Sequence, residues 1–334
     1  MPAGAAPERQ LARLMDGFVV TQALHVAARL DVAGALARGP RTGPDIAAAV
    51  GADAGALTRV LRCLSVEGVL DERDDGTFAL TPVGAALPTF AGPIAARAEV
   101  YYGAAAGLLD AVRDGGTAFE RVHGERFFAH LERHPDREAA FQSSMAARAE
   151  GEARDVLAAY DFAGLDRIVD VGGGTGALLG AILRAHPALH GELVDRPAAL
   201  ARARRRLEDD GVADRVQCRE GDFFAAVPGG RDAYLLSRVI HDWDDADSVR
   251  ILSVCRTAMG PSARLLLIDV ILPERAGDAP EAVRMDLHML ILFGARERTA
   301  AGFRELLATA GLGLRRVVPT GAPDGLAVIE ATPA

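Results

Sequence analysis

The stretch Asp170-Val-Gly-Gly-Gly-Thr-Gly176 decides the fold of this chain. It overlaps Arg167-Ile-Val-Asp-Val171, a short β-branched apolar run that predicts a buried strand. After the glycines, the apolar residues of 177–183 have helical spacing. A glycine-rich turn between strand and helix lets a ligand lie against bare backbone, because a Cβ there would collide with it.

The spacing of the glycines separates two classes of ligand. A dinucleotide-binding turn is spaced G-x-G-x-x-G and seats a pyrophosphate on the helix N-terminus. Here Gly172, Gly174 and Gly176 follow an acid in the order acid-x-G-x-G-x-G, which is typical of S-adenosylmethionine (SAM) sites. The spacing therefore disfavours the alternative of an NAD-dependent dehydrogenase. Such a turn alone is not specific, so the choice between SAM and a dinucleotide depends on motifs elsewhere in the chain.

Strands and helices alternate from Arg167 onward, which predicts a parallel, doubly wound sheet. The last two strands are joined by residues 321–325, too few for a crossover helix, so that pair is expected to be antiparallel. The expected strands lie at 167–172, 191–195, 215–221, 232–239, 263–272, 314–320 and 326–331.

Composition limits the classes of protein to consider. The 334 residues, half apolar and a quarter charged, leave room for two globular domains. No apolar run is long enough for a membrane span, and no signal-peptide core follows the N-terminus, so we expect a cytoplasmic protein with no membrane partner. Three widely spaced cysteines indicate neither disulfides nor a zinc site. The net charge of −9 disfavours nucleic acid as a partner.

Two helical segments precede the sheet. Residues 8–38 show helical apolar spacing with few polar positions, which fits either burial in a partner chain or packing within the chain. Residues 42–87 resemble a winged helix-turn-helix, which raises the alternative of a ligand-sensing DNA-binding regulator. Four arginines against seven acids between Arg41 and Phe90 would repel phosphate, so we interpret the module as a dimerisation surface. Residues 92–165 are mostly helical, with a long helix expected over 137–160.

Acidic side chains follow the second and third strands. Asp195 ends the second, where a carboxylate can accept hydrogen bonds from ribose hydroxyls, although it could instead cap the next helix. Asp222 ends the third and precedes Phe223; the pair suits an adenine amine and ring. Because the carboxyl ends of parallel strands meet at one sheet edge, both sites face the glycine turn.

A histidine follows the fourth strand at the same edge. His241 alone could be an ordinary hydrogen-bonded loop residue. Asp269, at the end of the fifth strand, and Glu297 are two carboxylates that could orient it. A histidine held by an acid is the arrangement that general-base catalysis requires.

Taken together, these motifs resemble the caffeate/flavonoid-type small-molecule SAM-dependent O-methyltransferases, in particular their bacterial natural-product branch. The resemblance covers nearly the whole chain through DVGGGTG, LVDRP, GDFF, RVIHDWDD, LLLIDVILPE and DLHMLILFGARERT. It implies an α/β protein in which a Rossmann-like seven-stranded class I methyltransferase sheet follows an N-terminal, mostly helical winged-helix dimerisation domain. The expected domains are 1–100 for dimerisation, 101–165 as a helical linker to the substrate pocket and 166–334 for SAM binding and catalysis.

The resemblance also implies roles for individual residues. SAM would be bound by Gly172, Gly174, Asp195, Asp222 and Phe223, with Ser237 standing where plant members have a lysine near the adenine. His241 would be the base, with Asp269 and Glu297 beside it. Plant members usually have Glu where this chain has Asp269, and the shorter side chain could lengthen the hydrogen bond to His241. The acceptor pocket would be lined by Phe141, Met145, Trp243, Met285, Met289 and Phe293, with His288 either bonding a substrate oxygen or satisfied in the core.

The resulting hypothesis is a homodimeric enzyme that methylates a phenolic hydroxyl of an aromatic natural product. His241 takes the hydroxyl proton, the oxygen attacks the methyl carbon in line (SN2), and S-adenosylhomocysteine is released; no metal is needed because the base lies within the protein. The alternative is a SAM-binding relative that catalyses hydroxylation, decarboxylation or cyclisation, often without such a base.

Overall fold

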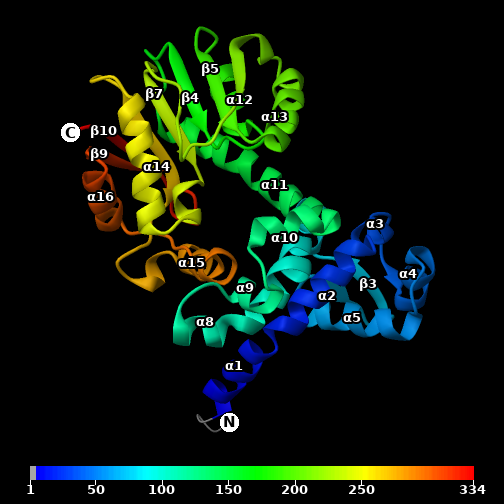
Figure 1. Cartoon of the computed structure of the whole chain (residues 1–334). Coiled ribbons are helices and arrows are strands. Elements are labelled where there is room, and N and C mark those ends of the chain that lie inside the picture. Colours follow the sequence, from blue (N-terminus) through cyan, green and yellow to red (C-terminus); the bar gives the residue numbers. More distant parts are fainter. Residues whose placement is uncertain (1–4) are drawn as a thin grey trace. The chain divides into compact units, whose positions relative to one another are not determined.

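The strand of the predicted strand–turn–helix is an inner strand of a seven-stranded sheet (Figure 1). Its strand order is β6-β5-β4-β7-β8-β10-β9, and β4 to β8 run parallel while β10 is antiparallel to both of its neighbours. All the expected strands are present, and the antiparallel last pair is confirmed. The strands are β4 (Arg167–Val171), β5 (His190–Asp195), β6 (Val216–Glu220), β7 (Ala233–Ser237), β8 (Arg264–Val270), β9 (Leu312–Pro319) and β10 (Leu326–Pro333).

Helices cover both faces of this sheet, because successive strand residues point to opposite sides. Ile168 of β4 belongs to a buried cluster with α12 (Ala177–Ala185), α13 (Pro197–Asp209) and the end of α11 (Pro135–Ala159). Its neighbour Val169 belongs to the opposite cluster, with α14 (Asp245–Ala258) and α16 (Ala300–Thr309). The central strands are therefore largely apolar on both faces, and the acids Asp170 and Asp269 lie next to the last residue of β4 and of β8.

The computed structural model describes residues 5–334, apart from the side chains at positions 5, 6, 143, 146 and 147. The chain divides into two compact units. One contains the residues up to Ala106 together with Phe128–Ala147, and the other contains Gly107–Phe127 with Arg148–Ala334. Helix α11 therefore contributes its first half to one unit and its second half to the other. The sheet unit also holds α8 (Leu108–Asp114), α9 (Ala118–His123) and α15 (Pro280–Phe293), whereas α10 (Phe127–Arg133) begins at the boundary.

The N-terminal unit contains the expected winged helix-turn-helix. Thr42 caps the first helix, α4, by accepting a hydrogen bond from the Asp45 backbone N–H, and Asp53 caps the second, α5, in the same way. Gly76 turns the hairpin of β2 and β3 with a φ of +76°. The elements of this unit are α1 (Ala5–Met15), α2 (Gly17–Arg29), α3 (Val32–Leu36), β1 (Arg41–Thr42), α4 (Gly43–Val50), α5 (Ala54–Val66), β2 (Leu70–Glu72), β3 (Thr77–Leu80), α6 (Leu87–Ala95), a π-helical turn (Ala96–Tyr101) and α7 (Tyr102–Ala104).

Helices α1 and α2 have an apolar face that the chain leaves uncovered. The side of α2 with Ala23 and Ala27 is buried in the core of its unit. Leu14, Met15 and Phe18, by contrast, are 70%, 69% and 53% exposed. Such a contiguous set is unusual on a monomer surface and marks an interaction site. Among the residues described, no helix is both long and apolar enough to cross a membrane.

Candidate active site

The glycine turn presents bare backbone at the carboxyl end of β4. Gly174 has a φ of +58°, and a Cβ added there would meet nothing within 4 Å. Gly172 has a φ of +70°, and its added Cβ would lie 3.0 Å from Val239 Cγ2 and 3.4 Å from the Phe223 ring. Both positions therefore need glycine for their conformation, and Gly174 also faces open space that a ligand can enter.

The two acids of the neighbouring strands are anchored by backbone N–H groups. Asp195 Oδ2 accepts a hydrogen bond of 2.8 Å from the Gly174 backbone N–H, and Oδ1 accepts one of 2.7 Å from Arg196. Asp195 is not the N-cap of α13, since that position is Arg196. Asp222 Oδ1 accepts 2.9 Å from the Phe224 backbone N–H. Each carboxylate keeps lone pairs for further donors such as ribose hydroxyls or an amine.

Asp170 lies beneath the turn and is 1% exposed. Its Oδ1 is buried and makes no hydrogen bond within the described chain. Burial, with a further contribution from the nearby Asp195 charge, raises the pKa of Asp170 to about 7. These features fit SAM: open glycine backbone, two anchored carboxylates, the Phe223 ring, and a buried acid lacking a partner.

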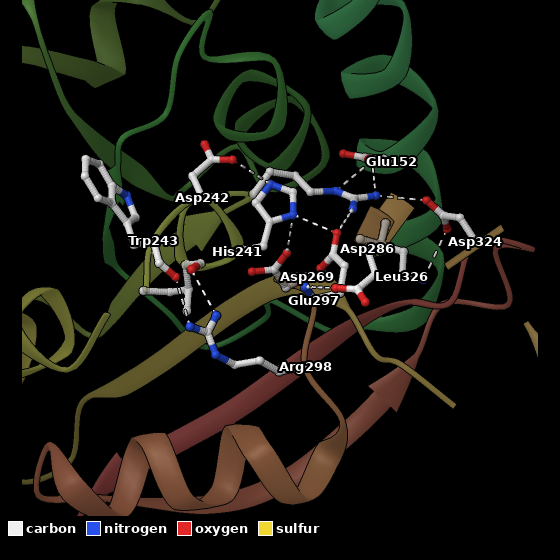
Figure 2. A network of polar contacts seen from close by, with 12 residues as sticks. Glu152, His241, Asp242, Trp243, Asp269, Asp286, Glu297, Arg298, Asp324 and Leu326 are labelled. Carbon is white, nitrogen blue, oxygen red and sulfur yellow. Dashed lines mark hydrogen bonds and ion pairs between the residues drawn. The ribbon is translucent and has the colours of Figure 1, made fainter. Parts of the chain in front are cut away.

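His241 lies in a single 3-10 turn, Ile240–Asp242, which is separated from the end of β7 by two residues, and it is 4% exposed. Its Nδ1 is 2.9 Å from Glu297 Oε1 and 3.4 Å from Asp269 Oδ1, while Nε2 is 3.5 Å from Asp242 Oδ1 (Figure 2). Glu297 and Asp269 therefore approach the same ring nitrogen, and only Glu297 is hydrogen-bonded to it. The longer distance to Asp269 agrees with its shorter side chain.

The three acids around His241 hold their protons more strongly than acids in water. Burial raises the pKa of Asp269 to about 6 and that of Glu297 to about 7, against lowering effects of His241 on Asp269 and of Arg238 on Glu297. Burial also raises the pKa of Asp242 to about 6. Both oxygens of Asp269 lack a hydrogen-bond partner among the described residues. Clusters of this kind are typical of catalytic sites.

Arg298 braces the turn that carries His241. Its buried guanidinium donates to the backbone carbonyl of Trp243 (Figure 2). It also donates to the carbonyl of Ile240, to Ser248 Oγ and to Asp245 Oδ1. Its backbone O accepts a hydrogen bond from Leu272 N–H, which joins this segment to the continuation of β8. The turn is thus held by a residue almost sixty positions later in the chain.

Two further contacts fix Glu297. Its backbone N–H donates to Asp286 Oδ1 of α15 at 2.8 Å. Arg238 Nη1 lies 3.9 Å from Glu297 Oε1, and the same guanidinium bonds Glu152 and Asp324. Sequence reasoning missed Arg238, Arg298 and Asp286, because no local pattern distinguishes them from ordinary charged residues. The motif RVIHDWDD contains Arg238, but its partners are 86 positions away in either direction.

The expected acceptor-pocket residues are divided between the two units of the chain. The sheet unit contains Trp243, Met285, His288, Met289 and Phe293, and the N-terminal unit contains Phe141 and Met145. Trp243 packs edge-on against Phe224, with ring centroids 4.7 Å apart, and Phe293 packs against Phe127 at 5.0 Å. Phe141 is buried and contacts the ring of Phe128. Of the other expected residues, Met285 and His288 are half-buried and Met289 is buried on α15 of the sheet unit, Ser237 ends β7, and Met145 lies with Phe141 in the N-terminal unit.

The site has one further chemical capacity. One ligand atom each from His241, Asp269 and Glu297 lies within 4.8 Å of the others, which is close enough to hold a metal ion. Nitrogen and carboxylate oxygen together suit divalent transition metals. The cluster can therefore serve either as an oriented base or as a cation site.

Comparisons with known proteins cover almost the whole chain. The O-methyltransferase domain family matches residues 106–313, and the O-methyltransferase dimerisation domain matches residues 12–89. The phenazine O-methyltransferase of Lysobacter antibioticus is 41% identical over 99% of this chain and 98% of its own length. The 8-amino-8-demethylriboflavin N,N-dimethyltransferase of Streptomyces davaonensis is 38% identical over 97% of this chain and 96% of its own length.

Solved structures agree with this assignment. The structure of mitomycin 7-O-methyltransferase matches with a TM-score of 0.93 at 38% identity, covering 99% of both chains. An O-methyltransferase of neocarzinostatin biosynthesis, solved with S-adenosyl-L-homocysteine and 1,4-dihydroxy-2-naphthoic acid, matches at 0.80 and 35% identity over 94% of this chain and 96% of that one. The expected class I methyltransferase fold is thereby confirmed. This chain belongs to the SAM-dependent O-methyltransferase family that carries an N-terminal dimerisation domain and includes bacterial natural-product enzymes.

Proposed function

We propose that this enzyme methylates a phenolic hydroxyl of an aromatic natural product, with His241 as the general base. The observation that carries the proposal is the hydrogen bond of 2.9 Å between His241 Nδ1 and Glu297 Oε1. With Glu297 ionised, Nδ1 keeps its proton and Nε2 has a free lone pair. The acceptor hydroxyl then gives its proton to Nε2.

The donor side uses the glycine turn. Gly172, Gly174, Asp195, Asp222 and Phe223 would hold SAM, with Ser237 beside them. When bound, SAM would supply an electrophilic methyl group: the acceptor oxygen would bond to the methyl carbon as the carbon–sulfur bond breaks, and S-adenosylhomocysteine would leave. Holding the acceptor oxygen in line with the donor methyl group accounts for much of the expected rate enhancement.

The acceptor class is supported by the relatives. The neocarzinostatin enzyme was solved with a dihydroxynaphthoic acid, and the Lysobacter relative is named for phenazine O-methylation. Met285, Met289 and Phe293 of α15, with Trp243, are the proposed pocket residues of the sheet unit, and His288 is proposed as a polar contact. Thioethers and rings suit a flat aromatic acceptor.

Methylation of nitrogen is the second candidate, because one close relative is named an N,N-dimethyltransferase. A matched pair of acceptors separates the two: 1-hydroxyphenazine and 1-aminophenazine, each incubated with methyl-labelled SAM. We expect label on the hydroxyl compound. Label on the amine alone would favour the second candidate, and a product that carries no label would favour a non-methylating reaction.

The proposed mechanism uses the protein base rather than a metal. Dialysis against EDTA followed by the same assay should leave turnover unchanged. Loss of turnover that Mg²⁺ or Zn²⁺ restores would instead indicate that His241, Asp269 and Glu297 act as ligands.

We also propose a homodimer. The exposed apolar face of α1 and α2 lies within or beside residues 12–89, which match the dimerisation domain. Sedimentation equilibrium should give twice the chain mass, and Leu14→Glu with Phe18→Glu should shift it toward the monomer.

A further inference from the structure

Arg238 is a charged residue beside the site that has no role in the proposed proton and methyl transfers. It directly follows β7, three positions before His241, and its side chain is 12% exposed. Its Nε donates to Glu152 Oε1 at 3.0 Å and its Nη2 donates to Asp324 Oδ2 at 2.9 Å. Its Nη1 makes no hydrogen bond in the described chain and lies 3.9 Å from Glu297 Oε1. Two nitrogens are thus anchored and the third faces Glu297.

The backbone at this residue is strained. Arg238 has a φ of +55°, a conformation that only Asp31 shares among the described non-glycine residues. This backbone conformation is unfavourable for any residue that has a Cβ. Such strain persists where surrounding contacts hold the residue in place, and here Glu152 of α11 and Asp324 of the β9–β10 loop supply them.

The charge of Arg238 matters because acids dominate the site. Burial would lower the pKa of Arg238, but Glu152, Asp269 and Glu297 raise it above the ordinary value, so its guanidinium stays charged. The groups that face Glu297 come from five places in the fold: Arg238 after β7, Asp286 on α15, Arg148 on α11, the adjacent Arg298, and His241 with Asp269 at the sheet edge.

We propose that Arg238 is a positioning residue for the base: its guanidinium keeps the Glu297 carboxylate ionised and in place, so that Glu297 holds the Nδ1 proton of His241. The inference rests on the proposed function, in which Nε2 of His241 accepts the substrate proton. If Glu297 were protonated, its O–H would donate to Nδ1, the ring proton would move to Nε2, and Nε2 could no longer act as a base.

The proposal predicts a specific change in the pH profile. Loss of the Arg238 charge favours protonation of Glu297, so in Arg238→Met the acid limb of kcat should move up by about one pH unit. At pH values below the acid limb, kcat of Arg238→Met should be about tenfold lower than that of the wild type. The difference should shrink as pH rises. Arg238→Lys keeps the charge and should shift the limb less. KM for the acceptor should change little in both variants.

Glu152→Gln provides a control of opposite sign. It removes the negative charge that offsets Arg238, while the Gln side-chain carbonyl can still accept the hydrogen bond from Arg238 Nε, so the acid limb should move to lower pH. This variant also tests the proposal if Arg238→Met does not fold. An equal loss of kcat at every pH in Arg238→Met, or an unshifted limb in Glu152→Gln, would overturn the proposal and leave Arg238 a structural residue.

A direct measurement separates this inference from the proposed function. In protein labelled with ¹⁵N-histidine, the Nδ1 and Nε2 shifts of His241, assigned by their loss in His241→Ala, report which nitrogen is protonated. At pH 7.5 we expect the Nδ1–H form in the wild type and a larger Nε2–H population in Arg238→Met. An unchanged tautomer would refute the inference, whereas full turnover of His241→Ala would refute the base and leave the tautomer result standing.

Discussion

The two halves of the sheet edge hold their acids in opposite ways. After β5 and β6, Asp195 and Asp222 are partly or fully exposed and accept hydrogen bonds from nearby backbone N–H groups. In the other half, Asp269 near the end of β8 and Glu297 after α15 are buried, and their pKa values are raised by that burial. Solvated, pre-oriented acceptors suit binding of a polar nucleoside, whereas proton transfer needs groups whose charge is sensitive to their surroundings. The proposed binding residues and the proposed catalytic residues thus occupy separate halves of one sheet edge, which we call the binding half and the chemical half.

The halves also differ in how they adopt left-handed backbone. In the glycine turn, Gly172 and Gly174 take positive φ without strain. Beside His241, the positive φ belongs to Arg238, whose side chain approaches Glu297 and is proposed to keep it ionised. In the glycine turn, the absence of side chains leaves room for a ligand. Beside His241, a strained backbone conformation carries the Arg238 side chain.

The largest expected effect falls on the chemical half. His241→Ala should lower kcat by about 10²–10⁴, because it removes the base that accepts the substrate proton. The affinity for S-adenosylhomocysteine, measured by calorimetry, should change little, since the nucleoside contacts lie in the other half. Normal turnover, or a large loss of affinity, would contradict the division between the halves.

Next in size is the effect of removing the brace. Arg298→Ala leaves the carbonyls of Ile240 and Trp243 without their donor, so the free energy of unfolding should fall by about 2–4 kcal/mol. Arg296→Ala is the matched control: Arg296 pairs with the same Asp245 but is 62% exposed, and its loss should cost less than about 1 kcal/mol. Urea titration of both variants measures the difference, and equal losses would rule out the bracing role.

The binding half should respond in affinity. Asp195→Ala removes a carboxylate proposed to accept ribose hydroxyls, so the Kd for SAM should rise by about 10- to 100-fold. The effect on kcat at saturating SAM should be much smaller than that of His241→Ala. If kcat falls and Kd does not, Asp195 belongs to the chemistry instead.

The smallest expected effect is a gain in stability. The folded-state pKa of Asp269 is raised from 3.8 to about 6, so its contribution to stability is complete below pH 3.8 and is lost as pH rises through about 6. At pH 8, Asp269→Asn removes a buried charge without a hydrogen-bond partner and should raise the free energy of unfolding by about 1–2 kcal/mol.

At pH 5 that gain should fall to about half, because Asp269 is mostly neutral in the folded protein but already ionised in the unfolded chain, and it should vanish below about pH 3.8. The exposed Asp278→Asn serves as control and should show no such pH dependence. Destabilisation by Asp269→Asn at pH 8 would mean that the Asp269 charge is compensated in the folded protein.

The sequence by itself determined the presence of a parallel sheet, the succession of strands and helices along the chain, and the family. These follow from local signals: Gly172, Gly174 and Gly176 at one turn, apolar strands, and acids such as Asp195 at strand ends. Because parallel strands bring their carboxyl ends to one edge, residues with such signals must converge. His241 and Asp269 are candidates for the same reason, whereas Glu297 is a candidate through the resemblance to the O-methyltransferases.

Only the tertiary structure decided how His241 is held. Glu297 and Asp269 share one ring nitrogen, at 2.9 and 3.4 Å, which no spacing in the sequence indicates. Arg238 and Arg298 reach their partners across 50 residues or more, and arginines on a surface have the same local pattern. Burial also sets the charge of these acids, and burial results from the packing of elements far apart in the chain.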